Sequence, residues 1–290
     1  MGVAVPAADP PVAADGGEAA PDRDWALPLV VLACEGQPHC GPEQAASLVA
    51  AAEQALRRFA TEPQRLPRRP QLLPRLLSTL NDDAASGREI AGIIARDPAL
   101  AAHLLKLANS ALYRSQPAPV ESLDRAVAMV GTGGLRHLIA VALMQPVMQV
   151  EGGVFGRLPE RVWEHTQHAA LAAARHARTM SKEDAFAAQL LALLHGLGAI
   201  VTVQALRDAC ASWHCAAPEP ALAARVLQAW APRIGCAVAK EWALSARLMQ
   251  ALDEQAHGDL SAMGGLGRVL ALAAPEASAA FAAPAARDAA

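Results

Sequence analysis

The histidines are the residues of this chain whose types and spacing could support chemistry. His165 and His168 stand three positions apart in a predicted helix and so share one face, and His195 follows about one helix later. In helical metal phosphohydrolases a histidine, a His-Asp pair and a more distant ligand hold two ions that polarise phosphate and generate hydroxide. Here Gly196 follows His195, so the bridging carboxylate is missing. The spacing favours structural histidines over a functional metal site.

The cysteines are the other candidate ligands. They include two pairs, each with a histidine beside it: Cys34 and Cys40 with His39, and Cys210 and Cys215 with His214. These pairs could be two halves of a zinc site, but neither has the usual two-residue spacing, and about 170 residues separate them. The five cysteines are too few for a disulfide framework, which favours reduced thiols in a cytoplasmic chain.

Other chemical motifs are missing from the sequence. There is no Gly-rich phosphate loop after a strand, no Gly-x-Ser-x-Gly elbow and no His-Glu-x-x-His. The formal net charge of −3 disfavours a strongly basic nucleic-acid clamp. We therefore expect no catalytic residues, no bound metal and no cofactor.

The composition predicts that helices position these residues. Roughly a quarter of the chain is Ala, the best helix former, whereas aromatic residues make up only 3% of the 290 residues. β-rich folds favour aromatic and β-branched side chains instead. An all-α fold follows, with helices expected near 43–60, 71–80, 98–110, 121–130, 135–150, 159–180, 182–195, 197–208, 220–232, 236–243, 245–256 and 260–274.

Several helix ends carry recognisable signals. Asp97 is placed to cap a helix that begins at Pro98, where a missing N–H costs nothing. Asn109 and Ser110 come near its end, where short polar side chains can bond the backbone. The GTGG sequence at 131–134 predicts a turn between helices. In a further helix start, Ser181 is the expected cap and Asp184 the third helical residue.

One stretch could be read as a membrane span. Residues 185–206 contain no Asp, Glu, Lys or Arg, and this length is sufficient to cross a bilayer. The stretch also contains His195, two Gln and two Gly, so we interpret it as a buried core helix that is broken near Gly196 and Gly198. The first 22 residues carry no Lys or Arg, unlike a secretory signal.

Segments across two thirds of the chain resemble the HDOD domain, an output domain related to the HD phosphohydrolases and found in bacterial signalling proteins. The resemblance covers about residues 64–258. It is most specific in the first half and looser around WEHTQH and LLHGLG in the second half. The motifs of the first half are Asp97-Pro98-x-Leu100, Leu107-Ala108-Asn109-Ser110 and Ala126-Val127-x-x-Val130-Gly131.

The resemblance implies a multi-helix fold in which a leading helical subdomain packs on a degenerate HD-like bundle. The expected organisation, in chain order, is a disordered tail at 1–22, an N-terminal helical extension at 23–62, the leading subdomain at 63–150, the HD-like subdomain at 151–274 and a disordered tail at 275–290.

The resemblance also implies a role. His165 aligns with the first HD histidine and His195 with the histidine of the His-Asp pair, but Gly196 replaces the Asp that many members keep. The sequence 253–255, Asp-Glu-Gln, replaces a His pair of several members. HDOD domains generally lack the full metal set, so we expect a non-enzymatic regulatory module that binds signalling proteins.

Two alternatives stay open. The first is a cryptic metal phosphohydrolase that acts on cyclic dinucleotides or nucleotides through His165, His168 and His195. The second is nucleic-acid binding through the Arg-rich stretch 57–75, which has no interleaved aromatic residues for base stacking and is more typical of a solvated linker. Neither alternative involves a membrane.

Overall fold

The computed structural model describes residues 24–68, 94, 98–113, 119–148, 150–181 and 183–282. Within these ranges all the regular elements are helical, and a single isolated β-bridge joins His39 to Ala217. The predicted all-α fold is therefore confirmed. The helices, in order, are α1 (Ala26–Ala33), α2 (Pro42–Thr61), η1 (Pro63–Arg65), α5 (Pro98–Ala108), α6 (Leu123–Met148), η2 (Gly153–Phe155), α7 (Leu158–His176), the π-helical turn η3 (Ala177–Ser181), α8 (Ala185–Trp213), α9 (Pro220–Glu241), α10 (Ala246–His257) and α11 (Gly265–Ala282).

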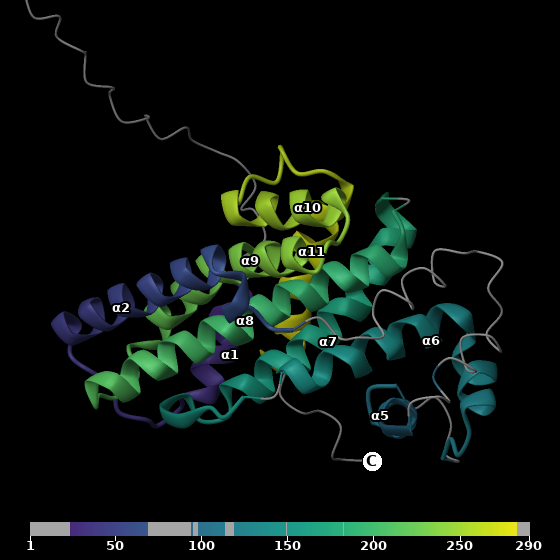
Figure 1. Ribbon diagram of the computed structural model, residues 1–290, viewed down its shortest axis with the longest axis horizontal. Helices are drawn as coiled ribbons and strands as arrows, with labels where there is room; N and C mark the ends of the chain where they lie inside the picture. The colour runs from purple at the N-terminus through teal and green to yellow at the C-terminus, as the bar shows by residue number, and fades with distance from the viewer. Residues whose placement is uncertain are drawn as a thin grey trace, which may run out of the picture.

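Helix α8 is the centre of the bundle. It contacts α2, α6, α7, α9, α10 and α11, and Figure 1 shows it among these helices with α5 and α6 to one side. Its length and hydropathy would suffice for a membrane span, but 89% of its apolar window is buried inside the protein. The prediction of a buried core helix is confirmed, because neighbouring helices occupy the surface that lipid would otherwise cover.

The predicted break near Gly196 and Gly198 is wrong, since α8 runs through both residues without interruption. These glycines instead permit close packing. A Cβ on Gly198 would lie 1.9 Å from the Ala231 carbonyl oxygen of α9, and a Cβ on Gly235 would lie 2.8 Å from the Leu194 carbonyl oxygen of α8. The two helix backbones therefore touch where neither has a side chain, and α9 likewise continues across the gap predicted between 232 and 236.

Other predicted boundaries shift for local reasons. The cap of α8 is Asp184 and not Ser181, because its carboxylate accepts hydrogen bonds from the Phe186 and Ala187 N–H groups at 2.7 and 2.9 Å. The turn predicted at 131–134 is a kink in α6 at Gly131, where φ is +66° and ψ is 179°. Only glycine adopts such a conformation readily.

The tail predicted from residue 275 begins too early. Helix α11 continues through Pro275 to Ala282, and its Ala277 and Ser278 side chains are buried. Small side chains let this helix lie close against α7 and α1, which contact it directly. The helix shown in yellow in Figure 1 is therefore part of the core, and tertiary packing outweighs the disordered composition seen in the sequence.

Candidate functional site

Helices α7 and α8 bring the two predicted HD histidines together. His165 lies on α7 and His195 on α8, and both side chains are buried. The Trp25 ring packs against both histidines: it stacks on His165, with the ring centroids 5.2 Å apart, and lies edge-on to His195 at 4.9 Å. The sequence therefore identified the pair correctly, but it did not reveal that an indole fills the space beside both rings.

The N-terminal extension holds Trp25 in this position. The Asp24 carboxylate accepts hydrogen bonds from the N–H groups of Ala26 and Leu27, at 3.2 and 2.8 Å, and so caps α1. The carbonyl of Trp25 accepts a 2.6 Å hydrogen bond from the Ser278 hydroxyl of α11. The backbone at Trp25 is thus held in two ways: by the Asp24 cap of α1 and by the hydrogen bond from α11.

Thr166 occupies the space where a carboxylate after His195 would begin. A Cβ built on Gly196 would lie 2.1 Å from Thr166 Oγ1 and 2.4 Å from its Cγ2. The Thr166 hydroxyl donates a 2.6 Å hydrogen bond to the Val162 carbonyl, which fixes its orientation. Gly196 is therefore required by the packing of α7 against α8, and an aspartate does not fit at this position in the present arrangement.

The two histidines are neutral. Burial lowers the pKa of His165 to about 4, although its hydrogen bond to Ala274 opposes the shift and His168 adds to it. Burial also lowers the pKa of His195 to about 3, and the proximity of the His165 ring contributes to this shift. Because Nε2 of His165 donates to the Ala274 carbonyl oxygen at 2.9 Å, this nitrogen has no lone pair left for a metal.

His168 stands apart from this pair. It is half-buried, burial lowers its pKa, and its nearest aromatic partner is Phe281 of α11, with ring centroids 5.7 Å apart. Phe281 also lies near His165, at 6.5 Å. The i,i+3 spacing thus places both histidines against the C-terminal helix and does not direct them to a common ion.

Of residues 253–255 of α10, only Gln255 reaches the site. Gln255 donates a 2.7 Å hydrogen bond to the Gly267 carbonyl, and Glu254 accepts a 3.0 Å bond from the Gly264 N–H. Gln255, His195 and Trp25 line a small cavity of 170 Å³ whose described lining contains no carboxylate. A binuclear metal centre needs carboxylate ligands to balance its charge, so the residues present here do not fit the paired ions of an HD phosphohydrolase.

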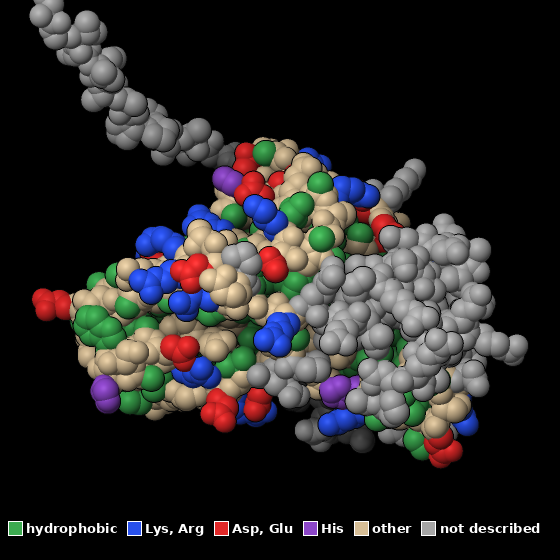
Figure 2. All heavy atoms as spheres, in the orientation of Figure 1, with side chains coloured by type: hydrophobic (Ala, Val, Ile, Leu, Met, Phe, Trp, Pro, Cys, Tyr) green, Lys and Arg blue, Asp and Glu red, His purple; other side chains and the backbone are tan. Residues whose placement is uncertain are grey.

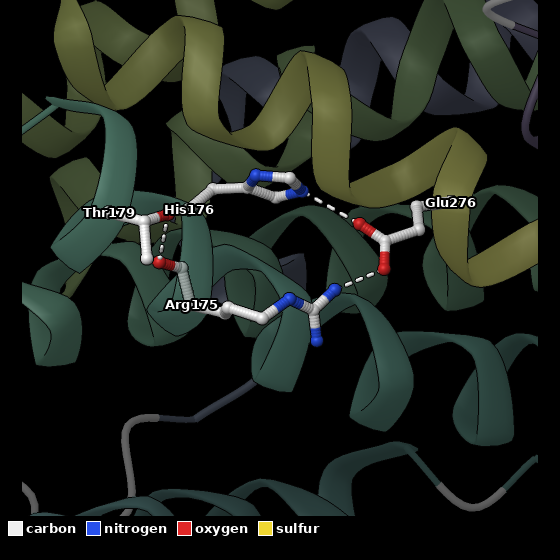
Figure 3. A network of polar contacts seen from close by, with 4 residues as sticks. All are labelled: Arg175, His176, Thr179 and Glu276. Carbon is white, nitrogen blue, oxygen red and sulfur yellow. Dashed lines mark hydrogen bonds and ion pairs between the residues drawn. The ribbon is translucent and has the colours of Figure 1, made fainter.

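A polar contact fastens α11 over this site. Figure 3 shows Glu276 of α11 turned toward Arg175 and His176 at the end of α7, with His176 Nε2 2.7 Å from a Glu276 carboxylate oxygen. Partial burial would raise the pKa of Glu276, but the hydrogen bonds from His176 and Arg175 outweigh this effect and lower it. Figure 3 also shows Thr179, which bonds the Arg175 carbonyl at 2.9 Å and continues α7 into its π-helical turn.

The motif residues of the first half hold turns. Pro98 is the first residue of α5, while Asp97 lies outside the described residues. The Asn109 side chain exchanges two hydrogen bonds with the Val120 backbone, donating to its carbonyl at 2.8 Å and accepting from its N–H at 2.7 Å. Ser110 donates to the Leu107 carbonyl at 2.8 Å. These hydrogen bonds join the end of α5 to the segment that precedes α6.

A third buried histidine, which no sequence motif indicates, lies near these turns. His137 of α6 contacts the Tyr113 hydroxyl through Nε2 at 2.8 Å, and burial lowers its pKa to about 4. Burial also raises the pKa of Tyr113. A single His in an apolar helix is a weak signal, and its tyrosine partner stands 24 positions away.

The cysteine pairs are arranged in an unexpected way. Cys40 lies beside Cys215 and Cys210, although the sequence separates the pairs widely, while Cys34 is buried elsewhere. In the described ranges no group of three or more His, Cys, Asp or Glu is placed to hold a metal ion.

Comparisons with known proteins agree with this architecture. No curated protein matches the chain. An HDOD domain protein of unknown function from Geobacter sulfurreducens is similar at 23% identity over 77% of this chain and 78% of that one, with a TM-score of 0.58. A proposed metal-dependent phosphohydrolase from Shewanella amazonensis SB2B is 22% identical over 78% and 82%, with a TM-score of 0.54. A proposed signal transduction protein from Marinobacter aquaeolei VT8 is 19% identical over 78% and 54%, with a TM-score of 0.52.

The family assignment rests on the sequence match. The family model for the HDOD domain matches residues 66–257, about two thirds of the chain. These residues include both buried histidines and the motifs of the first half. Trp25 and all of α11, which cover the histidines, lie outside the match. The chain belongs to the HDOD domain family.

Proposed function

We propose that this chain is a non-enzymatic regulatory module that acts by binding another protein. The observation that carries the proposal is the contact between Gly196 and Thr166, which leaves no room for the missing carboxylate. The stacking of Trp25 on both histidines supports the same conclusion, because it turns the former ligand positions into hydrophobic core.

The surface is compatible with such a role. Among the described residues, the exposed large hydrophobic side chains are Val31, Leu32 and Trp213, with 49%, 40% and 48% of their surface accessible. Exposed aromatic side chains are typical anchors of protein interfaces. On the face drawn in Figure 2, acidic and basic side chains are interspersed over the described surface, which favours a protein partner over a nucleic acid.

The described part of the Arg-rich stretch also favours a protein partner. Arg57 pairs with Glu53 at 3.2 Å, and Arg65 pairs with Glu62. These arginines are thus neutralised within their own segment, while Arg69 and Arg75 lie outside the described residues. If this stretch bound DNA or RNA, the affinity would fall steeply with salt.

Affinity purification with mass spectrometry from the native host tests the proposal. The tagged full-length chain is expected to enrich specific signalling proteins, and Trp213→Ser is expected to reduce that enrichment several-fold. Ser212→Ala is the matched control, because it changes the neighbouring exposed residue without removing apolar surface. A chain that enriches no protein above an unrelated bait would overturn the proposal.

A cryptic metal phosphohydrolase is the second candidate. It is favoured by the close approach of His165 and His195, which keep two positions of the HD ligand set side by side. It requires ligands beyond these two neutral histidines, and the described residues around them supply no carboxylate. This candidate predicts two tightly bound ions per chain and hydrolysis of cyclic dinucleotides that is lost in His195→Ala.

A further inference from the structure

Three thiols meet where the N-terminal extension contacts the loop between α8 and α9. Cys40 belongs to the loop between α1 and α2, Cys210 to the last turn of α8, and Cys215 to the residues just after that helix. The Cys215 thiol interacts with both of the other thiols and donates a 3.8 Å hydrogen bond to the Cys210 carbonyl. Segments far apart in the sequence thus supply one compact cluster.

Main-chain contacts hold the two loops in this register. The Cys40 N–H donates a 3.0 Å hydrogen bond to the Ala217 carbonyl, next to the β-bridge between His39 and Ala217. His214 adopts a left-handed conformation, with φ +49°, that turns the chain so that the Cys215 N–H donates to the Cys210 carbonyl at 3.1 Å. These backbone contacts hold the residues that carry the thiols next to one another.

The thiols differ in their access to small molecules. Cys210 is buried, whereas Cys40 and Cys215 are partly exposed. Cys40 also lines an open groove of 560 Å³ between α2 and the start of α9. A small oxidant in solvent can thus reach Cys40 and Cys215, whereas the buried Cys210 is shielded from solvent.

The local electrostatics disfavour thiolates. Burial raises the pKa of Cys40, and the Cys215 thiol raises it further. The same two causes raise the pKa of Cys210 to about 12. The thiolate that reacts with a peroxide is therefore a minor species at neutral pH, so oxidation of these thiols is expected to be slow there.

We propose that Cys40 and Cys215 form a reversible oxidation site, which a hydroperoxide converts to an intramolecular disulfide. One thiolate of the pair attacks the peroxide; a sulfur–oxygen bond forms, the O–O bond breaks, and the departing oxygen takes a proton to become water or an alcohol. The second thiolate then displaces the sulfenic oxygen, which leaves as water with one added proton. Two thiols lose two electrons in total, and the hydroperoxide gains them.

The disulfide would fasten the N-terminal extension to the bundle. It joins the loop that follows α1 to the loop that follows α8, and α1 begins beside the Trp25 that covers His165 and His195. Oxidation is therefore expected to hold the cover of the histidine pair closed. This site depends on thiol placement alone and is independent of the proposed binding role.

Thiol titration and peptide mapping of the full chain test the proposal. After reduction, desalting and treatment with hydrogen peroxide, two of the five thiols are expected to disappear and to return with dithiothreitol. Cleavage after Glu35 separates Cys34 from Cys40, and cleavage after Trp213 separates Cys210 from Cys215, so mass spectrometry identifies the linked pair directly. Because the thiol pKa is raised, the rate of oxidation is expected to increase with pH.

Matched variants sharpen the result. Cys40→Ser and Cys215→Ser are each expected to abolish the cross-link, whereas Cys34→Ser and Cys236→Ser are expected to keep it. The mapping of the unaltered chain does not depend on how these variants fold. A cross-link between Cys210 and Cys215, disulfides only between chains, or an unchanged thiol count would overturn the proposal. Stoichiometric zinc that protects all three thiols would overturn it as well.

Discussion

Gly196 packs against Thr166 beside His165 and His195, and this contact leaves no room for a side chain at position 196. The sequence shows that Asp is missing after His195, but it does not show why Gly takes its place. The structure supplies the reason: Thr166, one residue after His165, occupies the volume of any side chain at 196. The missing carboxylate can therefore be read from the residue types, while the steric requirement for Gly196 follows only from the packing of α7 on α8.

Replacement of Gly196 tests this contact. We expect Gly196→Ala to lower the free energy of unfolding by about 1–3 kcal/mol, because the new methyl group overpacks a buried interface. Gly41→Ala is the control: its Cβ would meet nothing within 4 Å, and its φ is −64°. Urea denaturation compares the two variants. An equal change in the free energy of unfolding of the two variants would show that Thr166 moves aside at little cost and would contradict the steric requirement for Gly196.

The buried histidines predict acid sensitivity. His165, His195 and His137 have pKa values of about 4, 3 and 4 when folded, below the ordinary value of 6.5. Between those values and pH 6.5 the unfolded chain binds more protons, so stability is complete above about pH 6.5 and falls as the pH decreases toward 4. Each histidine contributes a slope of up to about 1.4 kcal/mol per pH unit.

Urea denaturation at several pH values measures that slope. His195→Gln is expected to reduce it, because one of the three depressed histidines is gone. His257→Gln is the matched control, since this histidine side chain is exposed. An equal slope in all three proteins would contradict the assignment of neutral, buried histidines.

At the scale of elements, the helix boundaries that depend on contacts between distant segments were the least predictable. Apolar periodicity located α2, α5, α7 and α10 within a few residues of their observed ends, but it divided α8 and α9 into two helices each and did not predict α1. It failed at 275–282, where an Ala-rich composition looked disordered, and at Gly196 and Gly198, where glycines were read as a break. In both cases contacts between distant segments decide the outcome, and no local pattern records them.

Removal of the Trp25 side chain tests how the N-terminal extension docks. We expect Trp25→Ala to lower the free energy of unfolding by about 3–5 kcal/mol, as is typical of a buried tryptophan. Trp213→Ala is the matched control, because that tryptophan is 48% exposed and its loss changes stability by about 0.5 kcal/mol or less. Similar losses in the two variants would contradict the covering role of Trp25.

Truncation tests the C-terminal cover in the same way. A chain that ends before Pro275 loses Phe281 and the Ser278 hydrogen bond to Trp25, and we expect its free energy of unfolding to fall by on the order of 2–3 kcal/mol. A chain that ends after Ala282 keeps α11 whole and is expected to match the full-length protein. Thermal unfolding of the two truncations distinguishes these outcomes.

At the scale of the whole molecule, the fold and the family could be predicted and the closure of the site could not. The Ala-rich composition and the HDOD motifs indicated an all-α HDOD fold, and the structure and the family match confirm it. The covering of the two histidines depends on Trp25 and α11, which lie near opposite ends of the sequence and outside the family match. Trp25 and α11 contact each other and His165 only in the folded bundle, so no local sequence pattern predicts these contacts.

Metal content and turnover, measured together, test the central claim that this site is packed and not catalytic. The full-length chain is purified with manganese and iron present, its bound metal is quantified, and it is then assayed with cyclic dinucleotides and nucleotides. The account predicts no stoichiometric metal and no turnover above that of the His195→Ala variant. Two bound ions per chain, with hydrolysis that His195→Ala abolishes, would contradict it.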